Sequence, residues 1–348
     1  MNINMRKSNY IGFLYFWIHF LIEITSYYVV FTFFKSDRIV IFALIYDVLA
    51  FVPEGFYGMI RDIGIKINFG ILGMIISGAA ICLLFLDLPT VIMVVVVAIG
   101  NGMIHIQGAE MTLRTSDGKI FPSALFVSGG AFGLVIGRIL AFEGCPIWIV
   151  LLVHCTMIIP LLLAGRHKNI VKEGELKGFN FADVKKNASI VVFVATFVVI
   201  VRSYMGYVIP VEWNDNSYLS TILLFYFMGI GKAVGGYLTD KIGIRKTILI
   251  STLGSLPFLV IGNSIMPVSL VGLLMFSMTM AIALALIVSV MKSYPGVAFG
   301  FTTVGLFIGV LINAFIYISV LWVKDIVVSV LTIVSCVTLL YISNNERK

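Results

Sequence analysis

The sequence predicts an all-α integral membrane protein in which twelve transmembrane helices form two pseudo-symmetric six-helix bundles. Three observations support this fold class: an apolar composition, twelve long apolar segments, and a short charged pattern that occurs twice, about half a chain apart. Of the 348 residues, 60% are hydrophobic and 12% are charged, and the mean hydropathy is +1.08. A soluble domain carries about 25% charged residues, so we expect the bilayer to be the solvent of this chain.

The twelve segments are long enough to cross a bilayer, since a spanning helix needs about 20 residues. In chain order they are 9–34, 38–60, 67–86, 89–109, 120–143, 146–164, 188–211, 216–239, 247–265, 268–290, 295–320 and 325–343. The first follows Arg6 and Lys7 and is too long for the apolar core of a signal peptide, so it is expected to remain as a span.

A polar stretch at 165–187 separates six spans from six and is the predicted cytoplasmic linker. It divides an N-terminal six-helix bundle, residues 1–164, from a C-terminal six-helix bundle, residues 188–348. The basic residues of the linker are Arg166, Lys168, Lys172, Lys177, Lys185 and Lys186.

The Lys and Arg residues predict the orientation in the membrane. With both termini in the cytoplasm, eighteen of these residues lie inside and only Lys35, Arg38 and Lys324 lie outside. This bias follows the positive-inside rule, and an even number of spans agrees with it. The net charge of +7 therefore indicates topology in a cell membrane, with no nucleic-acid partner.

A charged motif follows the second span of each half. The second copy reads Gly236-Tyr-Leu-Thr-Asp240-Lys-Ile-Gly243-Ile-Arg245-Lys246, and the shorter first copy reads Gly58-Met-Ile-Arg-Asp62-Ile-Gly64-Ile-Lys66. The glycines allow close helix approach, and each carboxylate can accept from the N–H groups of a neighbouring helix N-terminus. The basic residues can hold that carboxylate. We expect a latch that closes the cytoplasmic side; the alternative is that these charges only anchor the helices.

The whole pattern resembles the major facilitator superfamily, in which two six-helix bundles rock about a central site. Four further segments resemble its fosmidomycin-resistance subgroup of drug:proton antiporters. They are His19-Phe20-Leu-Ile-Glu23, Gly100-Asn101-Gly-Met-Ile-His105, Phe126–Gly133 and Arg202-Ser203-Tyr204-Met205-Gly206. The departures are Glu23 for Asp, Gln107 where the subgroup tends to Gly, and a short chain; they leave the substrate open.

Ionisable residues within the spans mark the expected site, because each costs about 2.5–3.5 kcal/mol to insert without a partner or water. Glu23 and Arg202 lie at similar depth in the first helix of each half, and the resemblance implies that both helices line the central cavity. We expect them to face each other, with His19 one turn from Glu23. Glu23 would then exchange a proton; the alternative is a static ion pair.

Other charged groups leave alternatives open. Asp47 and Glu54 share a helical stripe and form either a relay along the path or two separately hydrated carboxylates. His105 binds a ligand or a neighbouring group. Lys232 reaches either the cytoplasmic interface, which we favour, or the cavity floor. His154 is interpreted as a packing residue.

The sequence carries no phosphate-binding loop, nucleophile elbow or metal-ligand spacing, so we expect no enzyme activity, no cofactor and no ATP-driven step. The predicted function is export of a small amphipathic or anionic solute by proton antiport, with membrane lipids around a monomer. One alternative is proton-coupled uptake or facilitated diffusion of a nutrient. Another is a non-transporting receptor or scaffold, against which the short C-terminal tail argues.

Overall fold

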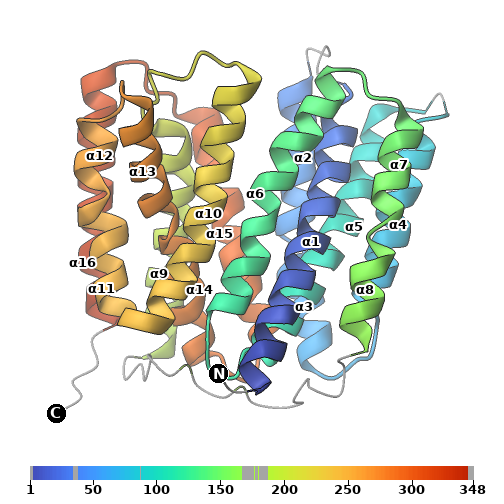
Figure 1. Ribbon diagram of the computed structural model, residues 1–348, viewed down its shortest axis with the longest axis horizontal. Coiled ribbons are helices and arrows are strands. Elements are labelled where there is room, and N and C mark those ends of the chain that lie inside the picture. Colours follow the sequence, from blue (N-terminus) through green and yellow to red (C-terminus); the bar gives the residue numbers. More distant parts are fainter. Residues whose placement is uncertain are drawn as a thin grey trace.

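The computed structural model describes residues 3–33, 38–86, 88–166, 176, 179 and 187–343. Every regular element in these ranges is helical (Figure 1), which confirms the all-α prediction. The predicted linker at 165–187 is described only at Gly165, Arg166, Leu176, Phe179 and Asn187, so its other residues lie outside the described part of the chain.

The helices pair into the twelve predicted spans. The first six spans are α1 (Ile3–Phe31), α2 with α3 (Ile39–Phe51, Glu54–Asp62), α4 (Phe69–Leu83), α5 (Thr90–Arg114), α6 (Phe121–Phe142), and α7 with α8 (Ile147–Cys155, Ile158–Gly165). The last six are α9 (Ala188–Val208), α10 (Tyr218–Ile242), α11 with the π-helical turn η2 and α12 (Ile244–Leu249, Ile250–Gly254, Leu256–Val260), α13 with α14 (Met266–Ser277, Thr279–Val290), α15 (Pro295–Phe315) and α16 (Leu321–Ile342).

Within the described ranges, ten helical segments are long and apolar enough to cross a membrane. The other two spans are α4, which has 15 residues, and the run α11–η2–α12, which the π-helical turn interrupts. Local sequence sets several helix starts. The side chains of Asn68, Asn187 and Ser217 each accept a hydrogen bond from a backbone N–H of the first turn, as N-capping residues do.

Figure 1 shows α1–α8 on one side of the molecule and α9–α16 on the other. Helix α6 packs against α10 between these two groups, and α15 packs against α2, α3 and α5. Glycine permits this approach, because a Cβ at Gly58 would lie 2.3 Å from the carbonyl carbon of Gly296. Likewise, a Cβ at Gly300 would lie 2.3 Å from Cα of Gly55.

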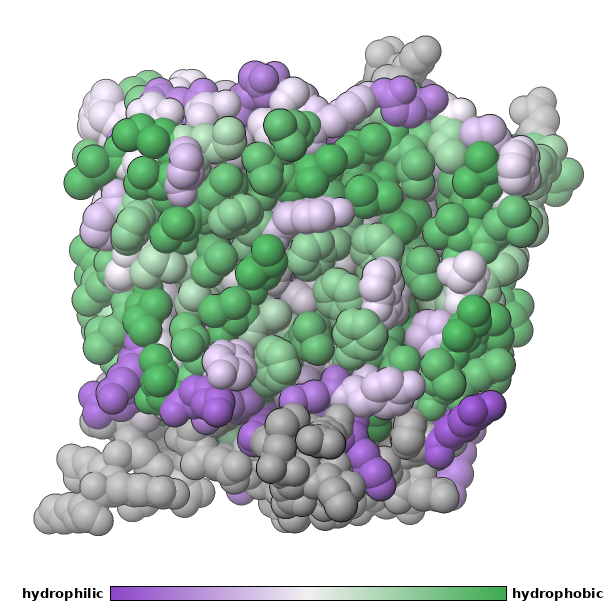
Figure 2. Space-filling model, in the orientation of Figure 1, coloured by the Kyte–Doolittle hydropathy of each residue, from purple (hydrophilic) through white to green (hydrophobic). Residues whose placement is uncertain are grey.

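On the face shown in Figure 2, apolar side chains form a broad belt and polar side chains gather towards the two ends. Large apolar residues are exposed on several helices, among them Phe193, Leu219 and Val337. Exposed apolar surface of this extent is expected of helices that face lipid. The chain is therefore built as a multi-pass membrane protein.

Candidate functional site

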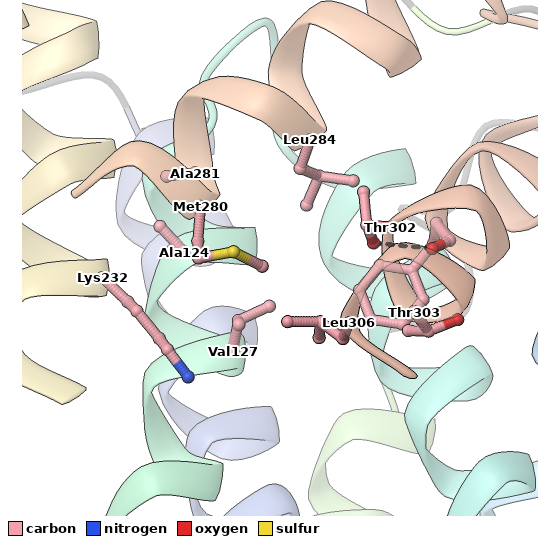
Figure 3. A pocket seen from close by; sticks show the side chains of 10 residues that line it. Ala124, Val127, Lys232, Met280, Ala281, Leu284, Thr302, Thr303 and Leu306 are labelled. Carbon is pink, nitrogen blue, oxygen red and sulfur yellow. Dashed lines mark hydrogen bonds between the residues drawn. The ribbon is translucent and has the colours of Figure 1, made fainter. Parts of the chain in front are cut away.

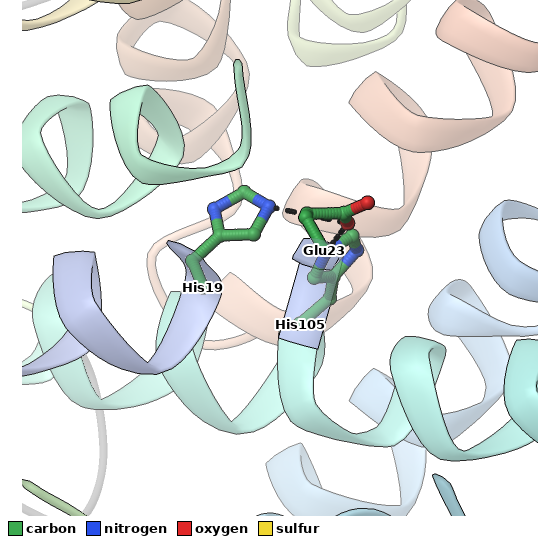
Figure 4. Close-up of side chains that lie close together, drawn as sticks. All are labelled: His19, Glu23 and His105. Atoms are coloured by element: carbon green, nitrogen blue, oxygen red, sulfur yellow. Dashed lines mark hydrogen bonds and ion pairs between the residues drawn. The ribbon is translucent and has the colours of Figure 1, made fainter. Parts of the chain in front are cut away.

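Four ionisable side chains from three helices meet inside the first group of helices. Glu23 Oε1 on α1 lies 2.9 Å from His105 Nε2 on α5 and 3.5 Å from His19 Nε2, one turn earlier on α1. The other ring nitrogen of His105, Nδ1, lies 2.8 Å from Oε1 of Glu54, which is the first residue of α3. All four side chains are buried. We call His19, Glu23, His105 and Glu54 the carboxylate–imidazole cluster; Figure 4 shows its first three members converging.

Neutral groups fix the geometry of the cluster. His19 Nδ1 lies 2.9 Å from the carbonyl oxygen of Phe126. Because a carbonyl only accepts, this nitrogen carries a hydrogen and leaves Nε2 directed at Glu23. Asn101 Nδ2 donates to both Glu23 Oε1 and Ser26 Oγ, at 3.0 Å each. The sequence gives no signal for Ser26 or Phe126 as partners of the cluster, and only the resemblance points to Asn101.

His105 can move protons because its ring stands between two carboxylates. When Glu23 and Glu54 are both ionised, both ring nitrogens of His105 must donate; when one carboxylate is protonated, the ring needs only one hydrogen. The arrangement can therefore take up a proton on one side of the ring and release one on the other.

Small residues on α6 make room for the cluster. A Cβ at Gly130 would lie 2.4 Å from His19 Nε2, and one at Gly133 would lie 2.2 Å from the carbonyl oxygen of Phe20. The glycine-rich stretch at 126–133 thus packs α6 tightly on α1, and this contact holds His19 and Glu23 in place.

Arg202 does not face Glu23, so the predicted contact across the cavity is wrong. Its Nη2 donates to the carbonyl oxygens of Ser251 and Phe276 and to Thr279 Oγ1, at 2.6 Å for the last. The guanidinium carbon also lies 3.6 Å from the centre of the Phe276 ring. Two residues at equal depth in related helices can still point in different directions, because depth does not fix the rotation of a helix about its axis. Helix α9 directs Arg202 towards η2, α13 and α14, which belong to the same group of helices as α9.

Lys232 is the cation at the central cavity. A cavity of about 30 Å³ lies between α6, α10, α14 and α15, which is room for about two water molecules (Figure 3). Lys232 lines it together with Thr302, Thr303 and apolar side chains such as Met280. The prediction that Lys232 reaches the cytoplasmic interface is therefore wrong, and the alternative, the cavity, is where it lies.

Asp47 and Glu54 lie in one span, Ile39–Asp62, on the two sides of the short break at Val52 and Pro53 that separates α2 from α3. Glu54 joins the carboxylate–imidazole cluster, whereas Asp47 stays half-buried outside it.

The two motif carboxylates each bind the start of a helix in the other group. Asp62 accepts from Gly296 N at 3.2 Å and Val297 N at 2.9 Å, at the start of α15. Asp240 accepts from Ile120 N at 3.0 Å and Phe121 N at 2.9 Å, at the start of α6. We call these contacts the two latches, and the end of the molecule that carries them the latch end, which is the lower end in Figure 1.

The structure gives Asp62 a basic partner from outside the motif. Arg114 of α5 pairs with Asp62 at 3.2 Å and also with Glu110 at 3.1 Å, and Arg61 pairs with Glu110 at 2.6 Å. The sequence predicts Lys66 for this role in the first copy and Arg245 and Lys246 in the second. The latter two lie exposed on α11.

The motif glycines have two structural roles. Gly64 and Gly243 have φ angles of +89° and +88°, which glycine adopts without strain. They turn the chain between the spans. Gly58 and Gly236 lie at close contacts, since a Cβ at Gly236 would lie 2.3 Å from Cβ of Ala124.

The side chains of His19, Glu23 and His105 could also hold a metal ion. One ligand atom from each lies within 4.8 Å of the other two. Sequence analysis found no metal-ligand spacing because Glu23 and His105 are 82 positions apart. Helix packing alone brings them together.

No protein-family profile and no curated protein sequence matches the chain. Solved structures do match. The E. coli fucose:proton symporter FucP has a TM-score of 0.68 at 11% identity, covering 99% of this chain and 100% of that one. A second FucP structure, described as a major facilitator transporter in the outward conformation, has a TM-score of 0.65 at 12% identity, covering 97% and 100%. An outward-facing bacterial homologue of the iron transporter ferroportin has a TM-score of 0.62 at 12% identity, covering 99% and 100%.

These similarities show the fold. The chain has the twelve-helix architecture of solved major facilitator transporters, and the matched structures are transporters, not enzymes. At 11–12% identity they do not fix the substrate or the direction of transport.

Proposed function

We propose that this chain is a secondary active transporter of the major facilitator superfamily that exports a small amphipathic or anionic solute in exchange for protons. The observation that supports it best is His105, held between Glu23 and Glu54 in the interior of the molecule. Two carboxylates and two imidazoles buried together are costly unless they share protons. A proton-coupled transporter uses such a site, because the occupancy of its protons can change as the site changes sides.

The central cavity supports the solute class. Lys232 supplies a positive charge to a cavity whose other lining is threonine and apolar side chains. The chemistry of this lining matches a solute with an anionic group and an apolar body, and the cavity, which has room for about two waters in this state, would widen to admit it.

The two latches support alternating access between two bodies, 1–164 and 188–348, which would act as a monomer. With both termini in the cytoplasm of a cell-membrane protein, the latch end is the cytoplasmic end. Closed latches then correspond to a state open to the outside, and two of the matched structures are described as outward-facing. Breaking the latches would open the cytoplasmic side.

The test uses purified protein reconstituted in vesicles, screened for solutes that an imposed pH gradient drives. We expect Glu23→Gln to abolish gradient-driven flux, because Gln keeps the shape but cannot carry the proton. Glu212→Gln makes the same change at an exposed site away from the cluster and should transport normally. Undiminished gradient-driven flux in Glu23→Gln would refute the role of Glu23.

Proton-coupled uptake is the second candidate, since one matched structure is a fucose:proton symporter. The sign of the response separates the two functions. A solute that moves against the proton flow indicates export by antiport, and one that moves with it indicates uptake. A receptor or scaffold would give no gradient-driven flux of any solute.

A further inference from the structure

We propose that His19 Nε2, the Glu23 carboxylate and His105 Nε2 form a binding site for one divalent transition-metal ion of the Zn²⁺ and Co²⁺ type. This goes beyond the proposed proton exchange, because it adds a ligand that neither the solute cavity nor the latches would take. The three ligand atoms lie within 4.8 Å of one another on buried side chains.

The distances suit a tetrahedral ion. With metal–ligand bonds of about 2.0–2.2 Å, two ligand atoms of a tetrahedral site lie about 3.4 Å apart. The separations from Glu23 Oε1 are 2.9 Å to His105 Nε2 and 3.5 Å to His19 Nε2, on either side of that value. The side chains therefore need to move by only a fraction of an ångström at these two edges. Water can take the fourth position.

The outer nitrogen of each ring already has the partner that a metal-bound histidine has. Such rings donate their second N–H to a backbone carbonyl or a carboxylate, which fixes the tautomer and aims the other nitrogen at the ion. Here His19 Nδ1 is paired with the carbonyl oxygen of Phe126 at 2.9 Å, and His105 Nδ1 with Glu54 Oε1 at 2.8 Å. Both Nε2 atoms consequently point to Glu23.

Charge and unused acceptors agree with a cation. With neutral imidazoles, Glu23 and Glu54 give the cluster two negative charges, which a divalent ion balances. Two buried acceptor atoms beside the cluster, Glu54 Oε2 and Asn101 Oδ1, have no hydrogen-bond partner among the described residues. A metal-bound water can donate to such atoms. Two imidazoles and one carboxylate favour transition metals over Mg²⁺ and Ca²⁺, which prefer all-oxygen sites.

The test measures binding without transport. Full-length protein, purified without a histidine tag and stripped with chelator, is titrated with ZnCl₂ by calorimetry and with CoCl₂ by visible absorption. We expect one saturable site and the intense visible absorption of tetrahedral Co²⁺. His19→Gln, His105→Gln and Glu23→Gln should each weaken binding at least about tenfold, and Glu54→Gln, which leaves all three ligands in place, about ten- to hundredfold.

Two other histidines provide matched controls. His154 is buried between Thr25 Oγ1 and the carbonyl oxygen of Met74, away from the cluster, and His167 lies outside the described residues. His154→Gln and His167→Gln should bind as the parent does. Size-exclusion elution and melting temperature show which variants are folded.

Lack of a saturable site in the parent would overturn the proposal, as would parent-like affinity in folded His19→Gln or His105→Gln protein. Loss of metal binding in folded His154→Gln or His167→Gln protein would also overturn it. Proton-driven flux measured in chelator-washed vesicles tests the transport proposal separately, so the two can fail independently.

Discussion

Glu23 and Arg202 are both buried charges, yet they are stabilised in different ways. Glu23 is surrounded by imidazole and amide groups that can donate to it or share its proton. Arg202 lies among carbonyl oxygens and against an aromatic ring, and its Nε and Nη1 atoms have no partner among the described residues. Arg202 therefore holds α9 to η2, α13 and α14, and we assign it a packing role.

Replacing Arg202 by Lys tests this role. The lysine side chain is shorter and ends in a single ammonium group, so it cannot reproduce the contacts of the planar guanidinium with two carbonyl oxygens and the Phe276 ring. We expect Arg202→Lys to lower the free energy of unfolding by about 1–3 kcal/mol, measured as a fall in melting temperature. The KM for solute should stay the same. A raised KM with unchanged stability would instead return Arg202 to the solute site.

Replacing Lys232 should change the KM for solute and leave the stability of the protein nearly unchanged, the opposite of the effect expected at Arg202. Lys232→Gln removes the cavity cation and should raise the KM for an anionic solute by about tenfold or more, with little change in melting temperature. Vesicle uptake at graded solute concentrations measures it. Lys241→Gln is the matched control, since Lys241 is exposed at the end of α10. Equal effects of the two substitutions would contradict the assignment.

At this scale the sequence predicts only part of the site. Helical spacing places His19 and Glu23 one turn apart, and the structure has them so. The partners of Glu23 on α5 come from 78 and 82 positions away, at Asn101 and His105. Periodicity tells which residues share a helix face but not which neighbour that face meets. The same limit explains the wrong partner for Arg202.

At the scale of helices, a carboxylate at the end of one helix binds the start of another. The N–H groups of a first turn have no partner within their own helix, and the helix dipole favours a negative charge there. Asp240 uses this at α6, whose first turn contains Pro122, and Asp62 uses it at α15, which begins with Pro295. The glycine contacts allow the helices to come close enough for these bonds.

Asp240→Asn should loosen the latch end. The neutral amide keeps an acceptor but loses the interaction with the helix dipole, about 0.3–1 kcal/mol, so the closed state should fall about two- to fivefold relative to the open one. Phe121 and Tyr237 lie across this contact, with ring centres 5.8 Å apart. A Phe121→Cys/Tyr237→Cys pair should therefore cross-link more slowly in the Asn variant. An unchanged rate would show that Asp240 does not hold the closed state.

At the scale of the whole molecule, composition and span length predict the fold well. The predicted boundaries fall near the observed helix ends, for example 188–211 against Ala188–Val208. The breaks inside spans, such as the π-helical turn η2, are not predicted, because apolar length carries no information on where a helix loosens. The relative placement of the two groups of helices depends on glycine contacts hundreds of positions apart, which no local pattern shows.

The orientation can be tested on the same scale. In a background with the four native cysteines replaced, Arg245→Cys at the latch end and Glu143→Cys at the opposite end are both exposed. A membrane-impermeant maleimide added to intact cells should label Glu143→Cys and leave Arg245→Cys unlabelled until the membrane is broken. The reverse pattern would place the latch end outside the cell.

The two latches are reciprocal, since each group of helices supplies one carboxylate and one receiving helix start. Four N–H bonds at one end must therefore be released together before the groups can part there. Restraints that act in parallel add their free energies, so their effects on the lifetime of the shut state multiply. Losing either carboxylate shortens that lifetime by one factor, and a chain without both should open on a timescale set by the remaining contacts between the groups, such as the glycine contacts and the Phe121–Tyr237 ring pair.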